Sequence, residues 1–257
     1  MQSQTHELIC GFRIDIRDLA RIVEDLWARM RRGDNQCVVA CANPHSIALS
    51  LQDPEFYDTL RGTEILLPDG IGLLLASQLL YGRIKQRVCG PDLFLEFSKV
   101  CNERGGARYF FLGSTPEVLS QLESNVAMQF PNIRIVGTYA PPFSNVFTHE
   151  ENERILSKIQ SAQPEALWVG MTAPKQEKWI HRNRNRLLVP ILGAIGAIFD
   201  FVAGTKKRPQ KVFSDLGLEW LIRLLSDPCR LWKRSIISFP VFFLAVLNQK
   251  RRKGQAR

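Results

Sequence analysis

The most informative stretch of the chain is residues 64–80, which read EILLPDGIGLLLASQLL. A short apolar run, Glu64–Leu67, leads into Pro68 and Asp69, and a second apolar segment with helical spacing, Gly70–Leu80, follows directly. A short buried strand that leads at once into a helix is the repeating unit of a parallel α/β sheet. We therefore predict one strand–helix unit here, with Asp69 at the junction.

The same alternation extends over most of the chain. The predicted strands are Cys37–Ala42, Glu64–Leu67, Arg108–Leu112, Arg134–Gly137, Ala166–Val169 and Pro190–Leu192. The predicted helices between them include Gly70–Leu80, Pro91–Arg104, Pro116–Gln129, Glu150–Ser161 and Pro174–Arg186. The fold class is therefore α/β, a Rossmann-like, mostly parallel sheet with helices on both faces. Ligands of such a sheet bind beyond the carboxyl ends of the strands.

Composition and charge divide the chain into two parts. Its 257 residues are 45% hydrophobic and 23% charged, which fits a globular protein and excludes a disordered or multi-pass membrane protein. The net charge of +9, from 34 basic and 25 acidic side chains, lies at one end. Residues 1–200 carry 21 basic and 22 acidic side chains, whereas residues 201–257 carry 13 and 3. We predict an α/β core over residues 1–203 and a basic C-terminal appendage over residues 204–257.

The appendage contains an apolar run of twelve residues, Ile236–Leu247, between two basic clusters. This run is too short to cross a bilayer, which takes about 20 residues. Apolar side chains flanked by cations are typical of a segment that lies in the interface of an anionic membrane. The alternative is a core or dimer-contact helix with a solvated basic face. Nucleic acid is a less favoured partner, because phosphate-binding stripes rarely join so apolar a run.

Several classes of site are not indicated. The six cysteines form no Cys-x-x-Cys pair, and the N-terminus lacks the basic and apolar regions of a secretion signal, so we expect a cytoplasmic protein without a disulfide scaffold or zinc site. The sequence has no P-loop, no dinucleotide-binding glycine fingerprint and no nucleophile elbow. It also lacks Asp-x-Asp, a pair that commonly holds a divalent cation on a nucleotide diphosphate. We therefore expect no metal ion and no other cofactor.

Polar side chains and glycines gather after the predicted strands. Asp69 could act as a general base on an attacking hydroxyl group, or as a helix N-cap. Arg87 precedes a helix N-terminus, which suits phosphate oxygens, and a plain surface arginine is the alternative. Lys175 and Gln176 could hold sugar hydroxyls or phosphate, whereas Glu177 is equally an acid favoured by the helix dipole. Further candidates at this edge are Asn43, His45, Asp92, Gly113 and Asp200.

Taken in order, these landmarks resemble the WecG/TagA/CpsF family, glycosyltransferase family 26, over residues 10–235. The matching stretches are Asn43-Pro44, Leu67–Gly72, Arg87–Leu93, Phe111–Gly113, Pro174–Trp179, Gly193–Asp200, Ala203-Gly204, Lys207–Pro209 and Gly217–Leu224. The resemblance implies an inverting, metal-independent transfer of a hexose from a UDP-sugar to a polyprenyl-diphosphate-linked saccharide, in the assembly of bacterial surface or exopolysaccharides. It also implies a peripheral protein at the cytoplasmic face of the plasma membrane.

The resemblance also assigns roles to residues of this sequence. It places the catalytic base on Asp69 and further active-site side chains on Asn43, Arg87 and Gln176, with Asp200 near the nucleotide. The arginines that close over the diphosphate match Arg208, Arg223, Arg230 and Arg234. Without a metal ion, guanidinium groups must stabilise the negative charge that builds on the departing diphosphate.

The sequence departs from the family pattern at Cys41, where relatives often carry Thr, and at His45. Both positions lie beside the expected sugar pocket, so the donor stays open among N-acetylmannosamine, glucose, glucuronate and N-acetylmannosaminuronate. A homo-oligomer is a possible assembly. The alternative functions are a non-catalytic nucleotide-sugar or lipid-diphosphate binding subunit of a polysaccharide assembly complex, and a nucleic-acid-binding protein that uses the basic tail.

Overall fold

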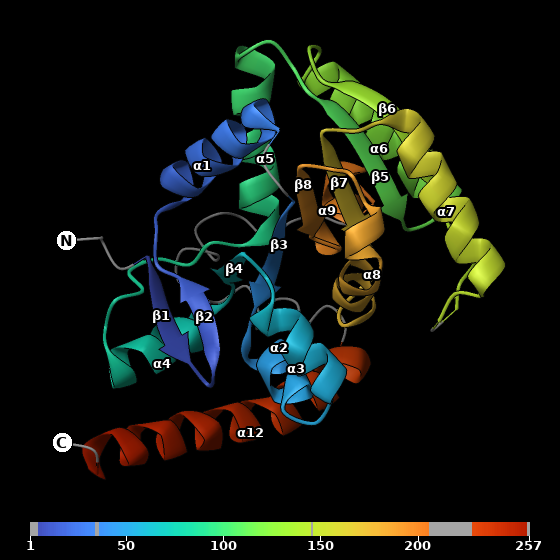
Figure 1. Cartoon of the computed structure of the whole chain (residues 1–257). Helices are drawn as coiled ribbons and strands as arrows, with labels where there is room; N and C mark the ends of the chain where they lie inside the picture. The colour runs from blue at the N-terminus through green and yellow to red at the C-terminus, as the bar shows by residue number, and fades with distance from the viewer. Residues whose placement is uncertain (1–4, 34–35, 145, 206–227, 256–257) are drawn as a thin grey trace.

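The computed structural model describes residues 5–33, 36–144, 146–205 and 228–255. The strands of the described residues are β1 (His6–Ile9), β2 (Phe12–Asp15), β3 (Cys37–Ala42), β4 (Ile65–Pro68), β5 (Arg108–Gly113), β6 (Arg134–Tyr139), β7 (Ala166–Gly170) and β8 (Ile191–Ala194). They form one eight-stranded sheet in the order β1-β2-β4-β3-β8-β7-β5-β6 (Figure 1). β1 and β2 are antiparallel, and every other neighbouring pair is parallel.

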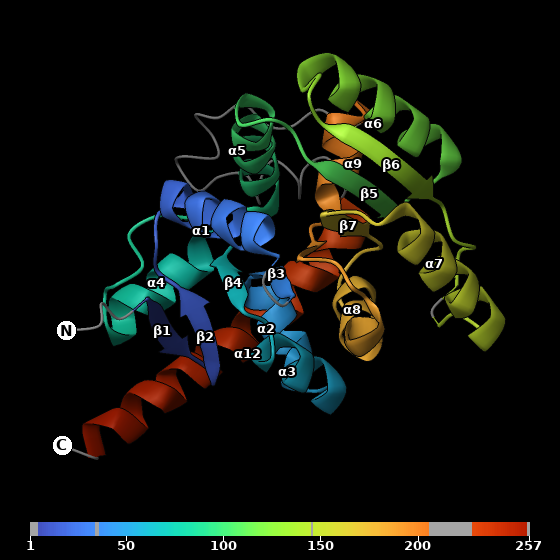
Figure 2. The same ribbon diagram turned by 45° about the horizontal axis from the view of Figure 1, so that its top comes forward.

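Helices cover both faces of this sheet, as Figures 1 and 2 show. One face carries α2 (Pro44–Ser50), α3 (Pro54–Arg61), α4 (Ile71–Leu80), α7 (His149–Ala162) and α8 (Lys175–Asn183), which is followed by the 3-10 turn η1 (Arg184–Arg186). The other face carries α1 (Leu19–Arg32), α5 (Gly90–Glu103), α6 (Pro116–Gln129) and α9 (Ala197–Val202). The predicted fold class is confirmed.

The strands separate two hydrophobic cores. In β3, Val38 and Ala40 belong to the core under α2, α3 and α8, whereas Cys37 and Val39 belong to the core under α1 and α5. Successive side chains of a strand point to opposite faces, so a strand buried on both sides reads as a continuous apolar run. This is why the inner strands β3, β4, β5, β7 and β8 were visible in the sequence, and the edge strand β6 was predicted as well from its Ile135-Val136 pair.

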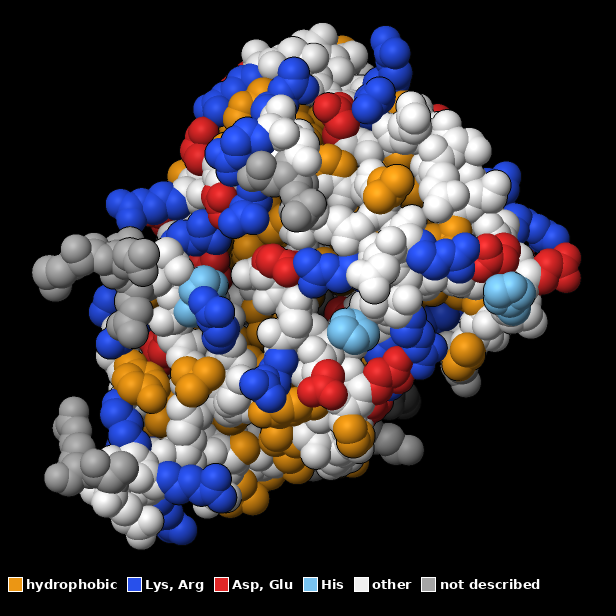
Figure 3. Space-filling view, in the orientation of Figure 1, with side chains coloured by type: hydrophobic (Ala, Val, Ile, Leu, Met, Phe, Trp, Pro, Cys, Tyr) orange, Lys and Arg blue, Asp and Glu red, His pale blue; other side chains and the backbone are white. Residues whose placement is uncertain are grey.

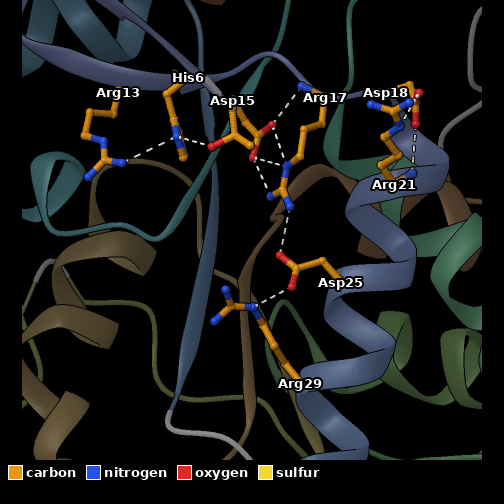
Figure 4. A network of polar contacts seen from close by, with 9 residues as sticks. His6, Arg13, Asp15, Arg17, Asp18, Arg21, Asp25 and Arg29 are labelled. Atoms are coloured by element: carbon orange, nitrogen blue, oxygen red, sulfur yellow. Dashed lines mark hydrogen bonds and ion pairs between the residues drawn. The ribbon is translucent and has the colours of Figure 1, made fainter. Parts of the chain in front are cut away.

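The β1–β2 hairpin and α1 were not predicted. A polar network joins them (Figure 4). The Asp15 carboxylate is fully buried and accepts two hydrogen bonds of 3.0 Å from Nε of Arg17. Nη1 of Arg17 donates to Asp25 at 2.9 Å, and Asp25 also accepts from Nε of Arg29 at 2.9 Å. The hairpin is therefore fastened to α1 by charge pairing, which hydrophobic periodicity does not reveal.

The C-terminal helix α12 (Pro228–Gln255) packs against α2 and α4 (Figures 1 and 2). Phe242 and Val246 are fully buried and belong to the core under α2, α3 and α8. Ile237 and Leu244, on the same helix, are each 60% exposed. The apolar run predicted for a membrane interface thus buries one face, as the core-helix alternative expects, and exposes another. No helix within the described residues has the length and apolar character needed to cross a membrane.

Polar contacts fix the far end of α12. The side-chain oxygen of Gln249 accepts from the N–H of Cys10 at 2.7 Å, and its Nε2 donates to the carbonyl of Leu8 at 2.8 Å. Nζ of Lys253 donates to the carbonyl of Leu80 at 3.1 Å and lies 3.5 Å from the ring centroid of Tyr81. These contacts hold α12 on the hairpin turn and on the end of α4.

Candidate active site

The sheet changes its direction of winding between β3 and β8. These neighbouring strands send their following helices, α2 and α9, to opposite faces of the sheet. Ligands of open α/β sheets bind at such a point, outside the carboxyl ends of the strands. A Cβ on Gly90 would lie 3.3 Å from Sγ of Cys41 and 3.1 Å from Cγ2 of Ile195. Segments that follow β3, β4 and β8 therefore meet closely here.

Asp69 stands at the carboxyl end of β4, half-buried. Its N–H donates to the carbonyl of Ala42 at 2.8 Å, which extends the pairing of β3 with β4 by one residue. Gly70 follows with a φ of 94°, a conformation that favours glycine, and Gly70 rather than Asp69 occupies the N-cap of α4. Helix capping therefore does not account for Asp69.

Arg87 and Asp92 lie beside this strand end. The N–H of Val88 donates to the carbonyl of Pro68 at 3.0 Å, which places Arg87 next to the end of β4. Asp92 lies in the first turn of α5 and accepts a hydrogen bond of 2.8 Å from Sγ of Cys89. Burial, with a further contribution from the neighbouring carboxylates, raises the pKa of Cys89, so this cysteine remains a thiol donor at neutral pH.

Asn43 and His45 lie where β3 passes into α2. The side-chain oxygen of Asn43 accepts from the N–H of Ser46 at 2.9 Å, and Oγ of Ser46 accepts from the N–H of Asn43 at 2.9 Å. This capping box uses the Asn43 oxygen, so a ligand contact from that side chain would come from its amide nitrogen. Nδ1 of His45 lies 2.7 Å from Oγ of Ser238, which is buried on α12. The C-terminal helix therefore contacts a predicted site residue directly.

Lys175 and Gln176 open α8 after a strained loop. Thr172 in that loop has a φ of 67°, which is unusual for a β-branched residue and is a feature of functional sites. Gln176 is buried, and its Oε1 accepts from the N–H of Met171 at 3.2 Å. The ammonium group of Lys175 donates to the carbonyl of Ser144, and burial lowers its pKa. Lys175 thus links the loop before α7 to the start of α8, at the carboxyl ends of the strands.

Four titratable side chains from separate segments lie near this edge. Burial raises the pKa of Cys41 well above the ordinary value, and the nearby ionisable groups of Asp69, Cys89 and Glu177, which are negative when ionised, raise it further. Cys41 is the penultimate residue of β3, Asp69 follows β4, Cys89 precedes α5 and Glu177 lies on α8. Tertiary structure thus brings together residues from four separate segments. No group of three or more such side chains suited to a metal ion occurs within the described residues.

The remaining predicted site residues fall in different places. Gly113 has a φ of 122°, and a Cβ there would lie 2.4 Å from the carbonyl oxygen of Gly170, so the packing of β5 on β7 requires glycine. Asp200 lies in α9 and its carboxylate accepts from Oγ1 of Thr205 at 3.3 Å. Two predicted arginines, Arg208 and Arg223, lie outside the described residues; Arg230 and Arg234 lie on α12, and their side chains are outside the description as well.

Two residues of the site were missed by sequence reasoning. Glu177 was interpreted equally as a first-turn acid favoured by the helix dipole, yet it is 4% exposed and hydrogen-bonded to Gln176. A polar pair of this kind after a buried strand is the only signal the sequence offers for it. Ser238 has no sequence signal at all, because its contact with His45 spans 193 positions.

Known proteins share this sequence pattern. The chain matches the glycosyl transferase WecG/TagA/CpsF family over residues 7–256. The N-acetylglucosaminyldiphosphoundecaprenol N-acetyl-beta-D-mannosaminyltransferase of Bacillus subtilis (strain 168) is 31% identical over 216 residues, 84% of this chain and 81% of the relative. The protein of the same name from Staphylococcus aureus (strain MW2) is 26% identical over 252 residues, 97% and 95% of the two chains. The chain is therefore a glycosyltransferase that belongs to the WecG/TagA/CpsF family.

Proposed function

We propose that this glycosyltransferase moves a hexose from a UDP-sugar to a polyprenyl-diphosphate-linked saccharide, with inversion and without a metal ion, in the assembly of a bacterial surface or exopolysaccharide. The observation that carries the proposal is Asp69, a half-buried carboxylate at the end of β4 that does not cap α4. The relatives named above support the acceptor class, because their names specify a diphosphoundecaprenol-linked N-acetylglucosamine.

Asp69 is the proposed general base. Its carboxylate takes the proton of the acceptor hydroxyl while that oxygen attacks the anomeric carbon from the face opposite UDP. The bond between the anomeric carbon and the diphosphate oxygen breaks, and UDP leaves with the bonding electrons. One displacement of this kind inverts the anomeric configuration.

Cations and helix ends are proposed to stabilise the leaving diphosphate. Arg87 lies beside Asp69 near the N-terminus of α5, where N–H groups and a guanidinium suit phosphate oxygens. Binding roles for the donor fall on Gln176 and Asn43 at the carboxyl ends of the strands, with Asp200 toward the nucleotide. The C-terminal arginines are proposed to complete the diphosphate site, namely Arg208, Arg223, Arg230 and Arg234.

The surface around α12 is proposed to dock on the anionic inner face of the plasma membrane. Figure 3 shows hydrophobic side chains along the edge where α12 runs in Figure 1, with Lys and Arg side chains toward its C-terminal end. The exposed apolar side chains of α12 and of the elements near it are Leu8, Leu51, Leu75, Tyr81, Ile237, Leu244 and Leu247. Apolar area beside cations favours an anionic lipid surface. A lipid-linked acceptor would be presented at that surface.

The function is tested by UDP release from a panel of UDP-hexoses that includes UDP-N-acetylmannosamine, UDP-glucose, UDP-glucuronate and UDP-N-acetylmannosaminuronate. Each donor is offered with and without N-acetylglucosaminyl-diphosphoundecaprenol in detergent, and with and without EDTA. We expect acceptor-dependent, EDTA-resistant UDP release from one donor. UDP binding without release in every combination would contradict the proposal and favour the non-catalytic binding subunit.

Membrane docking needs a test that spares the core. Deleting residues 236–257 would remove Phe242 and Val246 from the core under α2, α3 and α8, so a loss of membrane binding could reflect unfolding. We instead compare Arg251→Gln/Arg252→Gln, two exposed cations of α12, with the charge-matched control Lys99→Gln/Arg134→Gln on α5 and β6. Each cation near an anionic surface contributes about 1 kcal/mol, so we expect binding to phosphatidylglycerol vesicles to weaken by about tenfold or more in the first variant. Equal binding by both variants would refute this docking surface.

A further inference from the structure

Glu177 is a buried acid that a helix dipole does not explain. It is the third residue of α8 and is 4% exposed. Oε1 accepts a hydrogen bond of 2.9 Å from Nε2 of Gln176, whereas Oε2 is buried with no hydrogen-bond partner among the described residues. An acid that serves only the dipole gains nothing from burial, and a buried polar oxygen without a partner is costly. The position therefore calls for a role at the site.

The carboxamide of Gln176 is held at both ends. Its Oε1 accepts from the N–H of Met171 at 3.2 Å, and its Nε2 donates to Glu177. A Cβ on Gly196, at the end of β8, would lie 2.6 Å from that Oε1, so glycine leaves the room that the amide occupies. A carboxamide has two N–H donors, and the bond to Glu177 uses one of them. The carboxyl of Glu177 thus determines where the second N–H points.

Glu177 lies in the same cluster as the proposed base. Both Glu177 and Asp69 are close enough to Cys41 for their charges to raise its pKa. Burial raises the pKa of Glu177 itself to about 7. The titratable groups in this part of the site are Cys41, Cys89 and Asp69, and the cations Arg87, next to the end of β4, and Lys175, two residues before Glu177, lie on the neighbouring segments. A second carboxyl that is largely protonated below neutral pH limits repulsion within this cluster.

We propose that Glu177 is a positioning residue, which fixes the Gln176 carboxamide so that its second N–H meets a hydroxyl or phosphate oxygen of the bound donor. This inference rests on the proposed function, in which Gln176 contacts the donor. Glu177 acts only in donor binding, and no covalent bond is made or broken at its side chain.

The first test is a double-mutant cycle in the full-length protein, with the donor that the panel identifies. We expect Glu177→Ala to raise the KM for the donor by about tenfold and to change kcat by less than about threefold, because a mispositioned amide weakens donor and transition state alike. Glu177→Gln keeps an oxygen for Nε2 of Gln176 and should recover most of kcat/KM. In a Gln176→Ala background, Glu177→Ala should add less than about twofold.

Additive effects of the two substitutions would overturn the proposal, and so would a Glu177→Gln variant as impaired as Glu177→Ala at an unchanged Tm. A fall in Tm that is the same in both backgrounds, without coupling in KM, would assign Glu177 a structural role only. These outcomes separate positioning from packing.

A second measurement does not depend on turnover. The side-chain amide resonances of Gln176 in ¹⁵N-labelled protein, assigned by their loss in Gln176→Ala, should titrate with a midpoint near pH 7 and become invariant in Glu177→Gln. If no donor is turned over, the proposed function fails while these spectra still decide the present inference. Gln176 amide resonances with the same chemical shifts in the unsubstituted protein and in Glu177→Ala would refute it.

Discussion

Asp15 and Glu177 are two acids with nearly equal burial and opposite surroundings. Asp15 is fully buried in the hairpin–α1 network, where the guanidinium of Arg17 and its backbone N–H satisfy the carboxylate. Glu177 is 4% exposed at the ligand edge of the sheet, bonded to one carboxamide, and its second oxygen has no hydrogen-bond partner among the described residues. A buried acid with a complete set of partners stabilises the fold, whereas an incompletely satisfied one that lies among other site residues points to a role in binding.

The same contrast extends to the neighbours of the two acids. Around Asp15 the charges alternate, and Arg17 bridges to Asp25 and onward to Arg29 (Figure 4). Around Glu177 the neighbouring groups include acids and thiols, Asp69 among them, together with Lys175 and Lys178 of the same helix. Substitutions in the first region should therefore change stability, and those in the second should change activity or its pH dependence.

The largest effect is expected at Asp69. Asp69→Asn removes the proton acceptor, and general-base catalysis contributes about 10²–10⁴ in rate. We expect kcat to fall by about a thousandfold while Tm and UDP affinity stay within error. The measurement is acceptor-dependent UDP release, with calorimetry for UDP binding. Normal turnover by this variant would remove Asp69 from the role of base.

Asp15→Ala should produce the largest loss of stability in the comparison. It leaves Arg17, whose side chain is 18% exposed, without its buried partner, and breaking a buried pair costs about 3–5 kcal/mol. Because Arg17 keeps its ion pair with Asp25 and some contact with solvent, we expect the free energy of unfolding to fall by about 3 kcal/mol. The measurement is urea unfolding at pH 7. Turnover per folded molecule should be unchanged. A loss of less than about 1 kcal/mol in the free energy of unfolding would mean that the network does not hold the β1–β2 hairpin on α1.

Glu177 should make stability depend on pH. Its folded-state pKa of about 7 lies above the ordinary value of 4.5, so the proton binds the folded state more tightly. The stability that the protonated Glu177 carboxyl contributes to the folded state is fully present below pH 4.5 and is lost as the pH rises through 7. In urea unfolding, the free energy of unfolding of Glu177→Gln should rise by about 2 kcal/mol relative to that of the unsubstituted protein when the pH is raised from 5 to 8. Parallel pH profiles would show that the carboxyl is ionised throughout.

The smallest effect is expected where α12 reaches the site. Ser238→Ala removes the 2.7 Å contact with Nδ1 of His45, and a hydrogen bond of this kind contributes about 1 kcal/mol. We expect Tm to fall by about 2–4 °C and kcat/KM by about fivefold. The control is Ser124→Ala, which removes an exposed hydroxyl bonded to the carbonyl of Ser120 on α6. Equal effects of the two substitutions would show that the His45 contact has no bearing on the site.

Local chemistry was enough for the central elements of the fold. The predicted strand Cys37–Ala42 and helix Pro116–Gln129 coincide with β3 and α6 because a doubly buried strand is continuously apolar and a helix begins with recognisable capping residues. Asp69 was likewise predicted at a strand–helix junction, since Pro68 and Gly70 punctuate the chain on either side. The four-residue strands β1 (HELI) and β2 (FRID) carry no such run, because charged residues interrupt them, and the hairpin that they form is joined to α1 by charge pairs.

The sequence by itself therefore determined the α/β class, the six parallel strands and the edge where polar residues collect, because these follow from patterns within a few turns of chain. Only the tertiary structure decided which side chains meet there. The contact of Gln249 with Cys10 spans 239 positions and that of Ser238 with His45 spans 193. It also decided that Glu177 is buried, since burial depends on what packs over a residue and not on the residue itself.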